Sequence, residues 1–359
     1  MKIVMYGLTI TSSWGNGQAT TYRSLAKALA RKGHAIHFVE KDVEWYQNNR
    51  DLPEPEYCTV RLYEQWGREA RELVALAADA DVVLIGSYFP DAVAATRALV
   101  NADYGPIVFY DLDTPITMSQ LRDQGRTAYL DLSLIPLYDA YLSCTGGPAL
   151  AELESEFGAS WAVPFYGSVE ADLYRPVAEC LEFQCDLSYL GAYARDRQYK
   201  LMQLLNEPAR MLPDRRFIVA GPQYPGETPW QRNVGRMIHL SPDEHPCFYS
   251  SSRFSLHLTR TDMFAAGYCP SARLFEASAC GAAILSDHWL GIEEFFTPGE
   301  EILLPRDARE VSQILTGISE EERIRIGARA RERILSQHTS EHRAAQFEEI
   351  VATCSMAKA

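Results

Sequence analysis

One segment of the C-terminal half joins a helix start to charged residues that share a helical face. Ser271-Ala272-Arg273-Leu274 opens an apolar helical pattern, and Glu276 follows Arg273 by three residues. The first turn of a helix presents free N–H groups and a partial positive charge, which suit an anion such as a diphosphate. Arg273 opposes that helix dipole, so we interpret it as the partner of an anionic ligand. Glu276 could accept hydrogen bonds from a sugar diol, although a plain Arg–Glu surface pair uses the same spacing.

Further candidates for the same ligand lie at strand ends and helix starts of this half. A basic residue after a strand that ends in glycine could meet a diphosphate or simply face solvent, and main-chain groups after a strand could frame a planar base. These candidates are Gly191, Arg195, Arg197, Gly221, His239, Leu240 and Arg260.

Two carboxylates of the N-terminal half follow a buried strand, in Asp111-Leu-Asp113-Thr-Pro115. A general base must be a carboxylate or histidine within hydrogen-bond reach of the hydroxyl that it deprotonates. Asp113 is our first candidate for this role and Asp111 the second. The alternative is that Asp113 caps the helix that begins near Pro115.

The loop after the first strand is rich in glycine and small polar residues, and it includes Trp14-Gly15-Asn16-Gly17. Its glycines allow a ligand to approach the backbone closely, so we expect it to meet phosphates or an acceptor. Gly15-x-Gly17 is also a fragment of a dinucleotide-binding motif, and Glu40 ends the next strand as that motif requires. The third glycine is missing, which weakens the dinucleotide interpretation.

The elements that position these residues alternate between short apolar strands and amphipathic helices in both halves. This pattern predicts two doubly wound Rossmann-like α/β domains, at 1–168 and 183–336, with a final helix at 337–359 that returns to the first domain. Open α/β sheets bind ligands beyond the carboxyl ends of their strands. We therefore expect two such edges to face a central cleft, with one substrate held by each domain.

Composition limits the partners of the chain. Its 359 residues carry a formal net charge of -14, which disfavours nucleic acid as a partner because phosphate binding needs basic surface. The eight cysteines show no metal-ligand spacing, so we expect reduced thiols and no metal site. No leader or membrane-spanning run is evident, which predicts a cytoplasmic protein without integral membrane association. The sequence gives no indication of the oligomeric state.

The run from Leu258 to Ser286 resembles the spore-maturation (CgeB-type) family of glycosyltransferases, within the wider GT-B group. The resemblance rests on Thr259-Arg-Thr-Asp-Met263, Arg273-Leu-Phe-Glu276 and Ala279-Cys-Gly281. It extends to Trp14-Gly-Asn-Gly17 and Asp111-x-Asp113, and so covers nearly the whole chain. The resemblance implies a GT-B fold, with Glu276 on the donor ribose and Arg195 or Arg197 on the diphosphate.

One position departs from the related enzymes. Many retaining GT-B enzymes have a second glutamate eight residues before the ribose-binding one, and here that residue is Tyr268. The stereochemistry of transfer therefore stays open.

The resulting prediction is transfer of a sugar from a nucleoside diphosphate sugar, with UDP or dTDP as the expected nucleotide and no further cofactor. The acceptor would be a small molecule, a glycan or a protein. The alternatives are a nucleotide-sugar epimerase of the same fold, a non-catalytic nucleotide-sugar-binding protein and, more distantly, a nicotinamide dehydrogenase.

Overall fold

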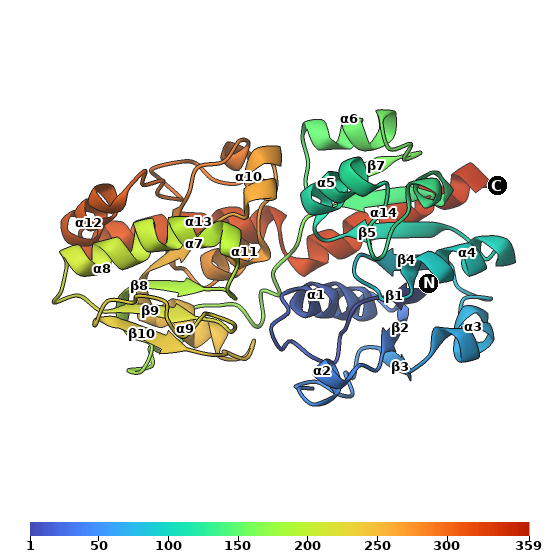
Figure 1. The fold of residues 1–359 in the computed structure, drawn as a ribbon, viewed down its shortest axis with the longest axis horizontal. Coiled ribbons are helices and arrows are strands. Elements are labelled where there is room, and N and C mark those ends of the chain that lie inside the picture. The colour runs from blue at the N-terminus through green and yellow to red at the C-terminus, as the bar shows by residue number, and fades with distance from the viewer. Residues whose placement is uncertain (359) are drawn as a thin grey trace. The chain divides into compact units, whose positions relative to one another are not determined.

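The computed structural model describes residues 1–358 and divides into two compact units (Figure 1). The first unit comprises Met1–Ser168 and the chain from Ser340 onward, and the second comprises Val169–Thr339. Each unit is built on one parallel sheet, as the alternating pattern predicted. The predicted fold class of two Rossmann-like α/β domains is confirmed.

The first unit contains a seven-stranded parallel sheet in the order β3-β2-β1-β4-β5-β6-β7. Its strands are β1 (Lys2–Tyr6), β2 (Ala35–Lys41), β3 (Thr59–Tyr63), β4 (Val82–Gly86), β5 (Ile107–Asp111), β6 (Ala140–Ser143) and β7 (Ala162–Pro164). Its helices are α1 (Gln18–Arg31), α2 (Glu44–Gln47), α3 (Trp66–Ala75), α4 (Ala92–Ala102), α5 (Thr114–Gln124), η1 (Leu132–Leu137), α6 (Pro148–Ser155) and α14 (Ser340–Lys358).

Alternate residues of these strands enter two separate cores, one on each face of the sheet. Val4 and Tyr6 of β1 belong to the core that includes residues of α3, α4 and α5. Ile3 and Met5 belong to the opposite core, with residues of α1 and α14. Burial of both faces explains the continuous apolar runs of the central strands.

The second unit contains a five-stranded parallel sheet in the order β10-β9-β8-β11-β12. Its strands are β8 (Cys185–Leu190), β9 (Phe217–Ala220), β10 (Val234–Met237), β11 (Ser252–His257) and β12 (Ala283–Ser286). Its helices are α7 (Arg195–Leu201), η2 (Met202–Asn206), α8 (Glu207–Met211), α9 (His245–Ser251), α10 (Thr261–Ala266), α11 (Ala272–Ala279), η3 (Ile292–Glu294), α12 (Ala308–Gly317) and α13 (Glu320–Gln337). The chain order reverses between β8 and β11, where open α/β sheets bind their ligands.

Some element limits differ from the sequence-based expectation. His239 and Leu240 lie in a loop beyond the sheet edge rather than at the end of a strand, because β10 ends at Met237. Strand β3 went unpredicted because it is a half-exposed edge strand without a continuous apolar run. The second unit begins at Val169 rather than at residue 183, since the backbone N–H of Val169 bonds to the carbonyl of His338 within that unit.

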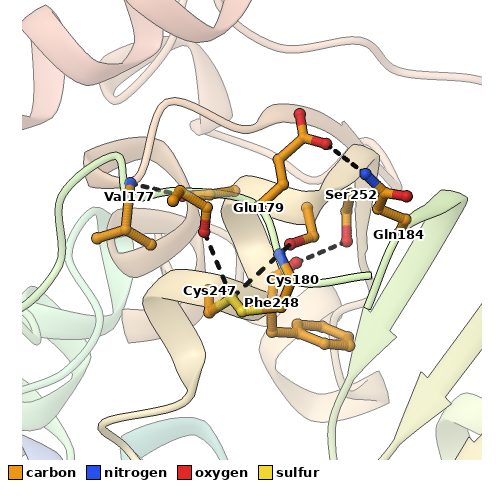
Figure 2. Close-up of a disulfide and its surroundings, with 10 residues drawn as sticks. Val177, Glu179, Cys180, Gln184, Cys247, Phe248 and Ser252 are labelled. Carbon is orange, nitrogen blue, oxygen red and sulfur yellow. Dashed lines mark hydrogen bonds between the residues drawn. A yellow bond between two sulfur atoms is a disulfide. The ribbon is translucent and has the colours of Figure 1, made fainter. Parts of the chain in front are cut away.

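The segment before β8 is also tied to the second unit by a disulfide between Cys180 and Cys247 (Figure 2). The two Cα atoms lie 6.2 Å apart, and 67 residues separate the cysteines in the sequence. The N–H of Cys180 donates to Ser251 Oγ at 2.8 Å on the same helix, α9. This bond corrects the expectation that all eight cysteines are reduced, which the sequence spacing could not reveal because the partners meet only in the fold.

Within residues 1–358, none of the helices has the length and apolar character that crossing a membrane requires.

Candidate functional site

An open pocket of about 870 Å³ lies at the carboxyl edge of the second sheet. Its walls are residues 192–197, which follow β8 and begin α7, and residues 260–262, which follow β11. Three predicted residues, Arg195, Arg197 and Arg260, therefore line one pocket. Arg195 is exposed, and Arg260 forms an ion pair with Asp196 at 3.4 Å. Asp196 and Asp262 also line the pocket, so its three guanidinium groups stand beside two carboxylates.

Arg197 is a buried cation whose hydrogen bonds are incomplete. Its side chain is 8% exposed, and one guanidinium nitrogen donates to the carbonyl of Ala192 at 2.9 Å. Its Nε has no hydrogen-bond partner within the described residues. Burial lowers the pKa of Arg197, and the positive charges of Arg273 and Arg260 lower it further. A buried cation with a free donor and like-charged neighbours is costly unless an anion binds there.

Arg273 extends from the first turn of α11 to the end of β8. Its Nη1 donates to the carbonyl of Leu190 at 2.5 Å. A Cβ atom on Gly191 would lie 2.5 Å from that nitrogen and 2.9 Å from the hydroxyl of Tyr189, so a larger residue there would displace the ends of both side chains. Gly221 fills an equally tight place, because a Cβ on it would collide with the Gly191 carbonyl. The two predicted glycines thus bring the ends of β8 and β9 close to Arg273.

His257, at the end of β11, completes this basic cluster. It is 5% exposed, its Nδ1 lies 3.2 Å from Ser286 Oγ, and its Nε2 has no partner within residues 1–358. Burial lowers its pKa well below the usual value, and the charges of Arg273, Arg197 and Lys200 lower it further. His257 is therefore neutral near pH 7 and can donate or accept one hydrogen bond from Nε2.

The start of α11 lacks a side-chain cap. Ser271 occupies the N-cap position, but its side chain makes no capping hydrogen bond. The first-turn N–H groups near Ala272 and Arg273 are therefore not used by the cap. Leu274, the fourth predicted residue of this turn, is fully buried and packs the helix into the domain.

Glu276 lies one turn further along α11 and is 4% exposed. Burial raises its pKa to about 7, against the opposing charge of Arg273 and a hydrogen bond from Tyr174. Glu276 is thus buried in the domain, which excludes the solvent-exposed surface pair that the spacing alone allowed. A carboxyl group poised near neutrality is typical of functional sites.

The loop after β10 holds the two residues that the sequence assigned to a base. Leu240 is 6% exposed, and its backbone bonds to the ring of His245. His239 is half-buried, whereas the preceding Ile238 is 73% exposed. The backbone of this loop is outside the sheet, where its groups can meet a ligand.

In the first unit, Asp113 and Asp111 occupy different environments at the end of β5. Asp113 stands at the N-cap position of α5 without a capping side-chain hydrogen bond. Its half-buried carboxylate lies close to the hydroxyl of Tyr88, and its charge helps to raise the pKa of that hydroxyl. The alternative role of Asp113 as a helix cap is therefore not realised by its side chain.

Asp111 is fully buried, and its carboxylate accepts hydrogen bonds from three donors. It accepts hydrogen bonds from the Tyr141 hydroxyl at 2.5 Å, the Thr117 hydroxyl at 3.0 Å and the Asp113 N–H at 3.1 Å. Burial raises its pKa to about 6 despite these three bonds. This corrects the placement of Asp111 as a second candidate base, because a carboxylate with no exposed surface cannot reach an acceptor hydroxyl.

Hydrogen bonds to the residues that precede it position the loop from Trp14 to Gly17. Trp14 and Asn16 are half-buried, and Gly15 and Gly17 are exposed. Glu40 accepts four hydrogen bonds from Thr9, Ile10 and Thr11, which precede this loop, and it is fully buried. Glu40 therefore anchors the loop and has no surface for a ribose, which disfavours the dinucleotide interpretation.

Sequence reasoning missed Tyr174, His245 and His257 near these groups. It also missed Tyr224, whose hydroxyl donates to the Gly191 carbonyl at 3.1 Å, and the ion pair of Lys200 with Asp287 at 2.5 Å. His257 and Asp287 directly end or follow strands, so the strand-end rule could have found them. Tyr174 and His245 carried no such signal, because each lies in a segment outside the predicted strands and helices.

The comparisons with known proteins agree with this architecture. Residues 197–349 match a family model described as glycosyl transferase-like. No curated protein matches the sequence. Sucrose-phosphate synthase from Thermosynechococcus elongatus has a TM-score of 0.71 at 14% identity, with 99% of this chain and 100% of that chain covered. HepE from Anabaena in complex with UDP and glucose gives 0.72 at 13% identity, with 98% and 100% covered.

A third solved structure, an alpha-glucosyltransferase in complex with UDP-glucose and DNA containing an abasic site, gives a TM-score of 0.67 at 13% identity. It covers 97% of this chain and 98% of that chain. At such low identity these likenesses establish the fold, and the family match covers most of the second unit. The chain thus shares the two-domain GT-B fold of these glycosyltransferase structures, and residues 197–349 of its second half resemble the glycosyl transferase-like family.

Proposed function

We propose that the protein transfers a sugar from a nucleoside diphosphate sugar to an acceptor hydroxyl, with the donor held by the second unit. The observation that carries this proposal is the buried Arg197, whose free Nε lies beside Arg273 and His257 at the carboxyl ends of the strands. This cluster belongs to the domain that matches the glycosyl transferase-like model. A diphosphate supplies the negative charge that the cluster lacks.

In this proposal, Arg197, Arg273 and the first turn of α11 neutralise the charge that develops on the leaving diphosphate. Such preorganised electrostatic stabilisation is the largest single contribution to catalysis in many enzymes. Glu276 accepts hydrogen bonds from the ribose hydroxyls, and the backbone after β10 meets the base. These guanidinium groups replace a metal ion, so we expect activity to persist in the presence of a chelator.

The proposed acceptor base is Asp113 of the first unit. Its carboxylate lies close to Tyr88 but is not consumed as a helix cap. The loop from Trp14 to Gly17 is a second acceptor-side element of that unit. We propose an acceptor that is a small molecule, a glycan or a protein, because the net charge of -14 disfavours a nucleic acid.

The finer assignment within the fold also remains a proposal. The Arg273-Leu-Phe-Glu276 and Ala279-Cys-Gly281 motifs support the CgeB-type family, and UDP or dTDP is the proposed nucleotide. Two of the similar structures hold UDP or a UDP-sugar, which supports testing UDP first. We also propose a cytoplasmic location.

The first experiment is a thermal-shift panel of UDP, dTDP, GDP, ADP and CMP with the wild type and Glu276→Gln. A nucleotide at about 100 times its dissociation constant should stabilise the protein by about 2.7 kcal/mol. We expect one nucleoside diphosphate to raise the melting temperature of the wild type and to do so much less in Glu276→Gln. The donor site is refuted if no nucleotide shifts either protein.

The second experiment separates transfer from binding. Release of the nucleoside diphosphate from matching nucleotide sugars is measured with and without candidate acceptors, in wild type and Asp113→Asn. We expect Asp113→Asn to keep the thermal shift but to lose about 10²–10⁴-fold in acceptor-dependent release, the usual contribution of a general base. Nucleotide binding with no turnover under any condition would instead indicate a non-catalytic binding protein.

A further inference from the structure

The proposed function leaves the buried carboxylate of Asp111 without a role. Asp111 is the last residue of β5, and its side chain is fully buried. Its Oδ1 accepts hydrogen bonds from the Asp113 N–H at 3.1 Å and the Thr117 hydroxyl at 3.0 Å, and its Oδ2 accepts one from the Tyr141 hydroxyl at 2.5 Å. Two of these donors lie at the start of α5, so Asp111 joins the end of a strand to the first turn of the next helix.

The first turn of α5 satisfies its backbone N–H groups without the carboxylate of Asp113. The N–H of Thr114 donates to Sγ of Cys144 at 3.3 Å, and Pro115 has no N–H. The N–H groups of the next two residues both donate to the carbonyl of Asp113, at 2.9 and 3.0 Å. A helix start often takes its cap from the side chain at the N-cap position. Asp113 occupies that position, but its carboxylate is spared from capping.

The hydrogen bonds that end on Asp111 all run in one direction. Burial raises the pKa of Asp111 to about 6, so the carboxyl group is mainly ionised at pH 7 and accepts from all three donors. The single proton of the Thr117 hydroxyl is therefore directed at Asp111. The hydroxyl of Tyr129 lies 2.7 Å from the Thr117 oxygen and must be the donor in that pair. The chain of donors thus runs from Tyr129 through Thr117 to Asp111.

Tyr129 also supports Tyr88, which lies beside Asp113. The centroids of the two tyrosine rings are 4.6 Å apart. The loops that carry Tyr88 and Asp113 are bonded to each other, because the N–H of Leu112 donates to Ser87 Oγ at 3.0 Å. Tyr88 has a backbone φ of 65°, which is costly for a residue other than glycine and is found most often at functional sites. The surroundings of Asp113 are therefore held through Tyr129, and its backbone is held by the Asp111 carboxylate.

We propose that Asp111 is a positioning residue that holds Asp113 in the orientation which an acceptor hydroxyl requires. Thr117 and Tyr129 are the side chains through which Asp111 acts on the surroundings of Asp113. This inference rests on the proposed function, because it takes Asp113 as the general base. It gives the two carboxylates after β5 separate tasks. The buried one fixes the geometry, and the half-buried one meets the substrate.

The test measures acceptor-dependent release of the nucleoside diphosphate by the wild type, Thr117→Val and Thr117→Ser. The substrates are the nucleotide sugar and acceptor on which the wild type is active, starting with UDP-glucose. Valine lacks the hydroxyl that joins Asp111 to Tyr129, so kcat should fall about 10–100-fold, as a small misplacement of a catalytic group causes. The dissociation constant of UDP should stay unchanged. Thr117→Ser keeps the hydroxyl and should restore the wild-type kcat.

Thr96→Val is the matched control. Thr96 is another fully buried threonine of the first unit, and its hydroxyl lies 2.8 Å from the hydroxyl of Tyr138. Its other hydrogen bond goes to the carbonyl of Ala92 within α4. Thr96→Val should therefore lower the melting temperature about as much as Thr117→Val while kcat stays at the wild-type value. An equal loss of kcat in both variants would show only a structural role and overturn the proposal.

A double-mutant cycle with Asp113→Asn separates positioning from stability. If Thr117 acts through Asp113, its hydroxyl has little left to position once the carboxylate is gone. Thr117→Val should then reduce the residual rate of Asp113→Asn far less than it reduces the wild-type rate. Losses that multiply in the double variant would mean that the two residues act independently, which would overturn the proposal.

Asp111→Ala is the direct variant, and it should lose at least as much kcat as Thr117→Val. It also leaves the buried Tyr141 hydroxyl without its acceptor, so the Thr117 variants decide the question if Asp111→Ala does not fold. Full activity of Thr117→Val beside a strong loss in Asp113→Asn would overturn this inference alone. Full activity of Asp113→Asn would instead refute the general base of the proposed function itself.

Discussion

Individual side chains of the second unit are placed for a ligand in a way that destabilises the ligand-free protein. Arg197 is buried beside two other cations with an unused donor, and Glu276 is a buried carboxyl group. Groups of this kind destabilise a domain when nothing compensates them. Functional sites commonly retain such groups at the expense of stability.

Replacement of Arg197 should separate stability from function. Arg197→Met removes a buried charge while keeping an unbranched side chain, so the melting temperature should rise by about 2–4 °C, on the order of 1 kcal/mol. The thermal shift caused by the nucleotide should disappear in the same variant. Arg195→Met is the control, since the exposed Arg195 should change stability little. A lower melting temperature for Arg197→Met would contradict the interpretation.

Glu276 should also set a pH dependence of stability in the ligand-free protein. Its pKa rises from 4.5 to about 7 on folding, so its favourable contribution is complete below pH 4.5 and is lost as the pH rises through 7. Glu276→Gln removes this dependence. The free energy of unfolding of the variant minus that of the wild type should therefore be more favourable to the variant at pH 8 than at pH 5. Urea unfolding at both pH values measures the difference, and an equal difference at both would refute it.

Among the elements, the ends of β8 and β9 leave space for Arg273 only because two glycines meet there. Gly191→Ala would place a methyl group 2.5 Å from the Arg273 guanidinium and force it away from Leu190. We expect nucleotide binding to weaken by at least tenfold, as seen by calorimetry. Gly226→Ala is the control, because its new methyl group would meet no atom within 4 Å. Normal binding by Gly191→Ala would contradict the close approach.

The disulfide is a second property of the elements, since it joins the segment before β8 to α9. A cross-link that closes a loop of 67 residues contributes about 2–4 kcal/mol in the chain-entropy account. The second unit should therefore unfold about 4–16 °C lower in reductant, at about 2–4 °C for each kcal/mol. Cys247→Ser should show the lower value with and without reductant. Mass spectrometry that finds both thiols free would contradict the bond itself.

At the scale of the whole molecule, the chain order makes the first unit depend on the last helix. Helix α14 supplies Ala344, Phe347, Ile350 and Val351 to the core that also contains α1. Its Glu341 and Glu348 pair with Arg31 and Lys32 at 3.1 and 3.0 Å. The first unit is thus complete only after the second has been synthesised.

Deletion of residues 340–359 should therefore destabilise the first unit selectively. Each buried aliphatic or aromatic side chain that is lost contributes about 1.5–3 kcal/mol, a large part of the stability of one domain. Calorimetry should show that one unfolding transition is lost or moves to a much lower temperature. The other transition should keep its melting temperature, and a nucleotide should still raise that temperature. Equal lowering of both transitions would contradict the division into two units.

The sequence by itself determined the alternation of strands and helices in both units, and with it the fold class. Each such element is encoded locally, by apolar periodicity and by glycines at the ends of strands. The same local signals predicted Arg273 and Glu276 on one face of α11, and Arg197 at the start of α7. Their assignment to a donor remains a prediction.

Only the tertiary structure decided which of these residues meet, and which distant residues join them. His257, Tyr174 and His245 lie near α11 because of the strand order of the sheet and the packing of α9, which no local pattern encodes. The fold likewise paired Cys180 with Cys247 and buried Asp111 while leaving Asp113 accessible. Burial and contact depend on the whole chain, because a residue's neighbours come from elements far away in the sequence.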